Sequence, residues 1–335
     1  MDQASTSDFC RSRAASALLG GGWAEWEAPI SFVDLTVGFP DSFSCELPPW
    51  VVVGVGDRDH LCAPRLDTFL EPGFSPELLR KSVMAQPAAA AVLIQLLRII
   101  PSLPAQQALV AESLAYATLQ GSASHEQWLE GRASSPSTAV AGVVELTREG
   151  DHALAVLNRP DSGNAIDQPM RDGLREAFAL VNMDLTIASI TLRAKGKAFS
   201  LGADLDEFGT TRDPATAHAI RQSTLPAAEA LRCSDRFFVE VDGACVGAGL
   251  ELAACASHIT ATRRSWFQLP ELAMGIIPGA GGCVSISRRI GRQRTALMVL
   301  SGRRISASTA LAWGLIDSIV DDLPGCNGKP DVVAA

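Results

Sequence analysis

Closely spaced cysteine pairs are absent from this sequence. Its eight cysteines are scattered over 335 residues, and no two of them form a C-x-x-C pair. That spacing is typical of zinc sites and redox-active disulfides, whereas many cysteines in a short chain are typical of secreted scaffolds. The sequence therefore predicts neither a metal site nor a disulfide framework, and it favours a reducing cytoplasm as the location of the protein.

The sequence also lacks a long hydrophobic run. Its longest apolar segment, residues 88–100, is interrupted by Gln95 and Arg98 and is shorter than the roughly 20 residues that span a bilayer. The first residues contain Asp2 and Asp8 and no basic region followed by an apolar stretch, so they match a secretory signal poorly. We therefore expect no membrane association and interpret residues 88–100 as a buried helix.

Basic residues are in the minority, since 28 lysines and arginines stand against 37 aspartates and glutamates, for a formal net charge of -9. An acidic surface does not attract nucleic acid or anionic membranes, so we expect neither as a partner. An anionic ligand would need a local basic pocket. The arginines of segments 263–264, 288–294 and 303–304 are candidates for such a pocket, although arginines of this kind usually face solvent or pair with carboxylates.

The sequence does contain enough apolar residues for two structural units. Hydrophobic residues make up 47% of it, and domains usually hold about 100 to 200 residues. Gly131 and the Ser/Pro-rich segment 133–138 are typical of a linker. Composition divides the chain into a flexible tail at 1–25, a mostly helical N-terminal extension at 26–138, an α/β unit at 139–320 and a short tail at 321–335.

Residue periodicity predicts the elements of each unit. The extension should contain a strand at 50–53 and three helices, which begin near Pro76, Ala88 and Gln106. The second unit should alternate between strands and helices, as α/β proteins do. Its strands are predicted at 143–146, 153–157, 187–192, 237–241 and 259–261, and its helices at 168–181, 215–231, 248–255 and between 283 and 313.

Two glycine turns of the second unit are candidates for an anion site. In segments 197–205 and 242–251, a strand runs into a turn of small residues and then into a helical stretch. Such a turn leaves the next backbone N–H, that of Ala203 or Ala248, free to donate. Two convergent donors stabilise the negative oxygen that develops on a thioester carbonyl when its α-carbon loses or gains a proton. Taken singly, each turn is more often a matter of tight packing.

Two glutamates lie in apolar surroundings near these turns. Glu251 is flanked by leucines and alanines on a predicted buried helix, and Glu271 stands in the apolar segment 267–282, which ends in a glycine-rich helix entry. Burial disfavours the charged carboxylate, so each pKa should rise toward the range that is useful for proton transfer. A single buried glutamate is usually structural, but two of them beside amide-rich turns favour acid–base chemistry.

Taken together, these segments resemble the enoyl-CoA hydratase/isomerase (crotonase) superfamily over about residues 140–320. Segments 197–207, 243–252 and 270–282 follow the family's order and spacing, and the two glutamates are 271 - 251 = 20 positions apart, as in the family's hydratases. The resemblance implies a crotonase-like spiral of ββα units and assembly into homotrimers or hexamers. It also implies an acyl-CoA thioester substrate and no cofactor, since coenzyme A is part of the substrate.

The resemblance also implies roles for individual residues. Ala203 and Ala248 would supply the oxyanion-hole amides, and Glu251 and Glu271 would activate a water and move the proton at the α-carbon. We therefore expect a hydro-lyase of the enoyl-CoA hydratase type. The substrate-binding surface is assigned to Gly202, Asp204, Gly247, Gly249 and Gly279.

Several alternatives remain open. Double-bond isomerisation, retro-aldol cleavage or cofactor-free oxygenation would use the same enolate, and an inactive acyl-CoA-binding subunit would only bind the thioester. Family members usually continue for several dozen residues beyond the point that matches Ile316 and Asp317, as helices that help close the acyl-CoA pocket. We hypothesise that the helical N-terminal extension replaces that cover. Tyr116 is expected to pack in a core without a catalytic role.

Overall fold

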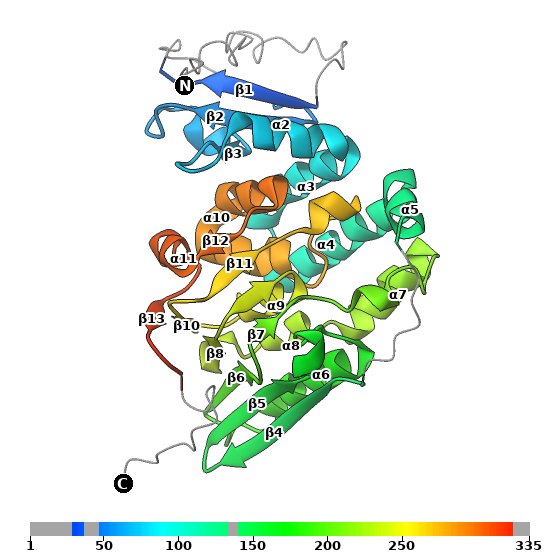
Figure 1. Cartoon of the computed structure of the whole chain (residues 1–335), viewed down its shortest axis with the longest axis vertical. Coiled ribbons are helices and arrows are strands. Elements are labelled where there is room, and N and C mark those ends of the chain that lie inside the picture. The colour runs from blue at the N-terminus through cyan, green and yellow to red at the C-terminus, as the bar shows by residue number, and fades with distance from the viewer. Residues whose placement is uncertain (1–28, 37–46, 133–139, 324–335) are drawn as a thin grey trace.

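The computed structural model describes residues 29–36, 47–132 and 140–323 (Figure 1). The tails and the linker that the sequence predicts lie wholly or mostly outside these ranges. The described residues form an N-terminal region, residues 29–132, and a C-terminal region, residues 140–323. In Figure 1 the strands β1 to β3 of the N-terminal region lie at the top, and the larger sheet of the C-terminal region lies at the bottom.

The N-terminal region combines a small parallel sheet, in the strand order β1-β2-β3, with helices. Val51, Val52 and Val53 of β2 are fully buried, as expected for a β-branched run in a covered parallel sheet. The predicted strand and three helices are therefore confirmed, and β1, β3 and α5 are additional. The bounds are β1 Ile30–Asp34, β2 Val51–Val55, β3 Thr68–Phe69, α2 Pro76–Ala85, α3 Pro87–Ile99, α4 Ala105–Gln120 and α5 Ala123–Glu130, with 3-10 turns η2 Ala63–Arg65 and η3 Ile100–Ser102.

The predicted buried helix at 88–100 corresponds to α3. Its residues Leu93, Ile94 and Leu97 are almost fully buried in the protein core, which confirms the prediction. No single helix among the described residues is long and apolar enough to cross a membrane; by length and composition alone, α2 and the stretch Pro87–Ser102, which meet at 107°, would pass as a bent pair.

The C-terminal region contains two sheets, and the consecutive strand pairs β6/β7, β8/β9 and β10/β11 each place one strand in each sheet. The larger sheet has the order β13-β10-β8-β6-β5-β4, and the smaller has the order β12-β11-β9-β7. The strands are β4 Val143–Glu149, β5 His152–Asn158, β6 Ser189–Ala194, β7 Ala198–Ser200, β8 Phe237–Val241, β9 Ala244–Val246, β10 His258–Thr262, β11 Trp266–Gln268, β12 Ile305–Ser306 and β13 Ser318–Val320. The helices are α6 Gln168–Met183, α7 Pro214–Thr224, α8 Pro226–Ala230, α9 Ala248–Ala253, α10 Gly282–Ser301 and α11 Ala307–Trp313, with 3-10 turns η4 Pro160–Ser162, η5 Leu205–Glu207, η6 Ser234–Arg236 and η7 Glu271–Met274.

One predicted helix is wrong in its extent. Residues 215–231 form two helices, α7 and α8, instead of one. Leu225 between them is extended, with φ -69° and ψ 114°. The residue before a proline avoids the helical conformation, and Pro226 has no N–H with which to continue the helix.

Helix α10 carries a large part of the junction between the two regions, and α4 packs on α7 beside it. Helix α10 contacts α2, α3, α4 and β3 of the N-terminal region as well as α9 and η7 of the C-terminal region. Across this junction, Arg294 pairs with Glu71 at 2.9 Å, and Thr68 Oγ1 donates to Gln293 O at 2.7 Å. Buried apolar side chains of both regions belong to one continuous core. The N-terminal region is therefore packed onto α10 as an integral part of the fold.

Candidate active site

A cavity of about 880 Å³ is lined by residues of both regions. The four residues predicted to carry the chemistry all line it, namely Ala203, Ala248, Glu251 and Glu271. Helices α4 and α5 of the N-terminal region contribute Tyr116, Gln120 and His125 to its wall. The fold thus brings the predicted residues around one space and adds side chains from the extension.

Asn164 anchors the strand that leads into the first glycine turn. It is fully buried, and its side-chain amide donates to Lys195 O and to Ala198 O, each at 2.8 Å. Ser200 Oγ donates to Asn164 O at 2.8 Å and accepts from Gly202 N at 3.1 Å. Gly202 has φ 98°, a conformation that residues with a side chain rarely adopt. This network fixes the backbone immediately before the first predicted oxyanion amide.

The N–H of Ala203 is left free by the pairing of its neighbours. Ile166 forms a parallel bridge with Ala203, in which Ile166 N donates to Gly202 O at 2.8 Å and Asp204 N donates to Ile166 O at 2.9 Å. In this pattern the central residue points its own N–H away from the neighbouring strand. Ala203 N donates to no other described residue, and Ala203 lines the cavity. A backbone donor is therefore available there.

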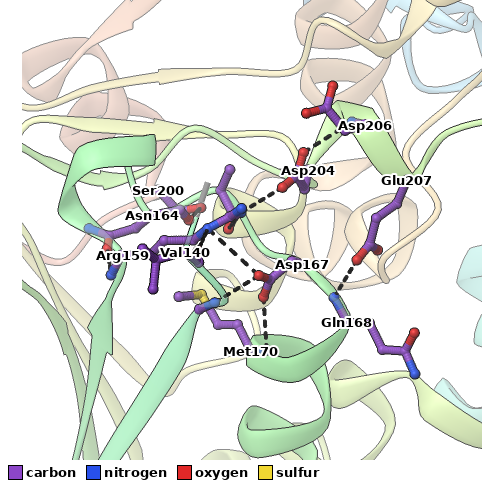
Figure 2. Close-up of polar contacts among 12 residues, drawn as sticks. Val140, Arg159, Asn164, Asp167, Gln168, Met170, Ser200, Asp204, Asp206 and Glu207 are labelled. Carbon is purple, nitrogen blue, oxygen red and sulfur yellow. Dashed lines mark hydrogen bonds and ion pairs between the residues drawn. The ribbon is translucent and has the colours of Figure 1, made fainter. Parts of the chain in front are cut away.

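Arg159 fixes the other side of the same turn (Figure 2). Its Nη1 lies 2.6 Å from Asp204 Oδ2, and its Nε lies 3.6 Å from Asp167 Oδ2. Burial opposes ionisation of Asp204, but the hydrogen bond from Arg159 helps to hold its pKa below the usual range. Asp204 Oδ1 accepts from Asp206 N at 3.0 Å. Asp204 lines the cavity, yet its oxygens are engaged by the protein, so it holds the turn rather than offering a free group to a ligand.

The second glycine turn lies against the first. Gly247 has φ 48° and ψ -127°, and Ala248 is the first residue of α9, so the N–H of Ala248 has no acceptor within the helix. None of the other described residues accepts it either. A methyl group placed on Gly202 would lie 3.6 Å from Ala248 N, so the two turns are in contact. Two free N–H groups therefore adjoin the same cavity, which is the arrangement that an oxyanion hole requires.

Glu251 is held at the N-terminal end of α10. Its Oε2 accepts from Ala280 N at 2.7 Å and from Gly282 N at 2.8 Å, whereas its Oε1 bonds to none of the described residues. Burial raises the pKa of Glu251 to about 7, although the two N–H groups and the charge of Arg221 oppose this shift. One oxygen thus fixes the side chain, and the other is available in a carboxyl that changes its charge near neutral pH.

Glu271 lies beside the second glycine turn. A methyl group placed on Gly247 would come within 2.7 Å of Glu271 Oε1. Burial, and then the charge of Glu251, raise the pKa of Glu271 well above its usual range. Its Oε2 is buried without a hydrogen-bond partner, a state that costs about 1 to 3 kcal/mol. The unpaired Oε2 of Glu271 is therefore suited to bind a water or a substrate hydroxyl.

Tyr116 and Arg221 are site residues that the sequence did not reveal. The guanidinium of Arg221 lies 4.2 Å from the centre of the Tyr116 ring and donates to Ser113 Oγ at 3.1 Å and to Gln120 Oε1 at 3.0 Å. The Tyr116 ring occupies the space beside Gly279, where a methyl group would lie 2.2 Å from Cδ2. Tyr116 packs against the protein core, as expected, but it also lines the cavity, which was not expected. An aromatic residue on an amphipathic helix gives the same signal whether it faces a core or a cavity.

Two further expectations are not supported by the geometry. Gly249 does not line the cavity, and a methyl group placed on it would lie 2.5 Å from Ser200 Cβ, so its small size serves packing. The arginines of the three candidate basic segments do not line the cavity either, whereas Arg171 and Arg221 do. Four of the segment arginines form ion pairs instead: Arg263 with Asp321, Arg264 with Asp242, Arg289 with Asp317 and Arg294 with Glu71.

The arrangement suits enolate chemistry. Two free N–H donors, on turns that contact each other, line one cavity together with two carboxyl groups whose pKa values are raised by burial. Across residues 29–36, 47–132 and 140–323, no group of three or more His, Cys, Asp or Glu side chains is placed to hold a metal ion.

The C-terminal region of the chain is similar to known proteins. A model of the enoyl-CoA hydratase/isomerase family matches residues 149–323. The chain is 33% identical over 184 residues to the mevalonyl-coenzyme A hydratase SIDH of Beauveria bassiana, which covers 51% of this chain and 64% of that protein. It is 30% identical over 174 residues to the 2,3-dehydroadipyl-CoA hydratase of Escherichia coli, which covers 52% of this chain and 68% of that protein.

A solved structure shares the fold of the C-terminal region. The enoyl-CoA hydratase/carnithine racemase of Magnetospirillum magneticum superposes with a TM-score of 0.50 at 32% sequence identity, over 55% of this chain and 70% of that one. The predicted crotonase-like spiral is confirmed by this likeness and by the family match. The chain spans about two thirds of the length of these relatives.

Proposed function

Because the chain belongs to the enoyl-CoA hydratase/isomerase family, we propose that it adds water reversibly to a 2-enoyl-CoA thioester. The observation that carries this proposal is the meeting of Ala203, Ala248, Glu251 and Glu271 at one cavity. Both carboxyl groups of the hydratase pattern are present, whereas family members that only isomerise a double bond often lack one or both. Two of the relatives named above are hydratases.

In the proposed reaction, the thioester carbonyl oxygen accepts hydrogen bonds from Ala203 N–H and Ala248 N–H. Water attacks the β-carbon while one carboxylate removes its proton, and the electron pair of the double bond moves toward the carbonyl. The resulting enolate oxygen is stabilised by the two N–H groups, and the loss of one such donor typically costs roughly 3 to 4 kcal/mol. The α-carbon then takes a proton from the other carboxyl group, which completes the addition of water.

The pKa values of the two glutamates support a reaction in which one carboxyl group acts as the base and the other as the acid. A carboxyl group with a pKa of about 7, as for Glu251, populates both protonation states near neutral pH. Burial and the charge of Glu251 both oppose ionisation of Glu271. Like charges that are close together resist ionising together, so one member of the pair holds a proton while the other accepts one.

Arg221 favours an acyl group that carries oxygen. Arg221 lines the cavity, and its guanidinium bonds to the neutral acceptors Ser113 and Gln120 and forms no ion pair with any described carboxylate. A guanidinium in this setting gains from a ligand oxygen, and most of all from a carboxylate. The relatives named above, which include a mevalonyl-CoA hydratase and a 2,3-dehydroadipyl-CoA hydratase, motivate polar acyl groups in the substrate panel.

The test is the loss of enoyl absorbance with crotonyl-CoA and with 2,3-dehydroadipyl-CoA. We expect the wild type to hydrate at least one of them. Glu251→Gln and Glu271→Gln should each lower kcat by about 100-fold or more, because each removes a group that transfers a proton. Unchanged rates in both variants would reject the assignment.

Asp172→Asn is the matched control, because Asp172 also lines the cavity but lies at its exposed edge and contacts Arg171 at 3.4 Å. Its kcat should stay within about threefold of the wild type. The mass of the product separates the alternatives: gain of water indicates hydration, an unchanged mass indicates isomerisation, cleavage indicates a retro-aldol reaction, and gain of oxygen indicates oxygenation. Thioester binding without turnover indicates an inactive binding subunit.

A further inference from the structure

Four consecutive backbone N–H groups at the start of α10, those of residues 280–283, are shared between two buried carboxylates. The first and the third donate to Glu251 Oε2, at 2.7 and 2.8 Å. The second and the fourth donate to Glu112, at 2.7 Å to Oε1 and at 2.8 Å to Oε2. The donors alternate along the chain, so Glu112 and Glu251 hold the same turn together.

Glu112 comes from helix α4 of the N-terminal region and is 1% exposed. It does not line the cavity, and both of its oxygens accept backbone N–H groups. It therefore has no oxygen available for a ligand, in contrast to Glu251, whose Oε1 is available. One helical turn later, Tyr116 of the same helix lines the cavity, and Gln120 follows one turn further on, so the C-terminal part of α4 faces the site.

We propose that Glu112 is a positioning residue for Glu251, through which the N-terminal region holds the first turn of α10 in the geometry that fixes the catalytic carboxyl group. Without Glu112, the buried N–H groups of Gly281 and Cys283 have no side-chain acceptor. The present conformation of the turn then leaves two N–H groups unpaired and is no longer favoured. The neighbouring N–H groups that hold Glu251 belong to the same turn. The catalytic part of this inference rests on the proposed function of Glu251.

A second contact from the N-terminal region reaches the other glutamate. His125 of α5 is 1% exposed, and its Nδ1 lies 2.8 Å from Met274 O, the last residue of η7, which begins at Glu271. Both carboxyl groups of the proposed pair are thus carried by turns that the N-terminal region holds.

Charge gives the inference a signature that a purely structural contact lacks. Burial, and then the charge of Glu251, raise the pKa of Glu112 well above its usual range, although backbone N–H groups oppose this. The pKa of Glu251 itself is raised by burial and lowered by the N–H groups of Gly282 and Ala280, so displacement of this turn removes a lowering influence and raises the pKa of Glu251 further. The titratable or charged groups that face Glu251 are Glu112 and Tyr116 from α4, Arg221 from α7, Cys255 after α9, Glu271 from η7 and Cys283 from α10.

Carbon NMR of protein labelled at the glutamate carboxyl carbon tests the inference, with the Glu251 resonance identified by its loss in Glu251→Gln. In Glu112→Gln, the turn holds the N–H groups of Ala280 and Gly282 less firmly against Glu251, so the titration midpoint of Glu251 should rise by about 1 pH unit. The kcat for hydration should fall about 10-fold or more, because the carboxyl group is displaced, while the Kd for a saturated acyl-CoA stays within about threefold. A midpoint at the wild-type value overturns the proposal whatever happens to kcat.

Glu71→Gln is the matched control. Glu71 is also a buried carboxylate of the N-terminal region that contacts α10, through Arg294 at 2.9 Å, but it lies away from the first turn of that helix. Its loss should weaken the same junction and leave the Glu251 midpoint unchanged. A shift as large as that in Glu112→Gln would show that general loosening of the junction is the cause, and it would overturn the proposal.

The wild-type protein supplies a measurement that does not depend on the folding of a variant. Because the charge of Glu251 raises the pKa of Glu112, the two carboxyl groups titrate as a coupled pair, and the Glu112 resonance should respond to the ionisation of both. Two independent single-step curves overturn the proposal. Because these spectra require no turnover, absence of hydratase activity in the wild type counts against the proposed function and leaves the test of Glu112 intact.

Discussion

At the scale of single residues, Glu251 is subject to two opposing influences. Two N–H groups hold its Oε2, which favours the charged carboxylate, whereas an exposure of only 2% favours the neutral acid. Burial has the larger effect and raises the pKa from an ordinary value of 4.5 to about 7. The folded protein therefore binds this proton more tightly than the unfolded chain does.

Stability should consequently fall as pH rises from about 5 to about 8 through this group. The stabilisation is fully present below the pKa of an unfolded glutamate and is lost as pH passes about 7, the folded value. The change in the free energy of unfolding is on the order of 3 kcal/mol. Urea unfolding at the two pH values measures it: Glu251→Gln should lose much of the pH dependence, and the exposed Glu126→Gln should retain it. Equal pH dependence in Glu251→Gln and the wild type would contradict this.

At the scale of elements, helix α4 is fitted to the glycine-rich entry of α10. The Tyr116 ring leaves no space for a side chain at position 279, since a methyl group there would lie 2.2 Å from the ring. The same helix supplies the Ser113 and Gln120 acceptors that hold Arg221 over that ring. The wall of the cavity is thus built from two elements that must match in shape.

Gly279→Ala should lower the free energy of unfolding by about 1 to 3 kcal/mol, because the added methyl group overpacks this contact. Combination with Tyr116→Ala should remove the penalty, so urea unfolding of the two single variants and the double variant should show strong coupling. Gly131→Ala is the control, since its nearest neighbour would be at 3.4 Å and its φ is -72°. Additive effects in the double variant would show that the two residues do not press on each other.

Element by element, prediction from sequence succeeded where the signal is local. The two glycine turns and both glutamates lie in short segments, and periodicity recovered the strands β4, β5, β6, β8 and β10 of the larger sheet. The short strands β9, β11, β12 and β13 were not predicted, because strands of two or three residues are too short to show a period. Glu112 and Tyr116 were missed because their partners are remote: Glu112 accepts from Gly281, 169 positions away. On a helix, a glutamate looks like a solvent-facing residue until its tertiary partners are known. The break at Pro226 was overlooked although the proline itself signals it.

At the scale of the whole molecule, the N-terminal region cannot be a passive appendage. It packs on α10 within one continuous core and lines the cavity through Tyr116, Gln120 and His125. Its contribution to the cavity wall agrees with the hypothesis that the extension covers the site. Its removal would expose the apolar face of α10 and leave Gly281 N and Cys283 N without Glu112.

Deletion of residues 1–135 should therefore abolish folding or leave an aggregated protein without hydratase activity. Circular dichroism and size-exclusion chromatography, followed by the enoyl-CoA assay, measure the outcome. Deletion of residues 1–25, the predicted tail, is the control and should leave activity within about twofold of the full chain. A truncation at 135 that is folded, correctly assembled and fully active would refute both the covering role and the role of Glu112.

The alternation of donors along residues 280–283 has a consequence for how this protein can be inherited or engineered. The proposed acid–base pair cannot be moved to another protein with the C-terminal region alone. Two of the four N–H groups of its turn donate to Glu112, which lies some 170 positions earlier in the chain. A chimera that transplants the C-terminal region alone would carry Glu251 without its counterpart. Substitutions at residue 112 and in the turn at 280–283 should therefore occur together. When segments are exchanged between homologues, both should come from the same parent.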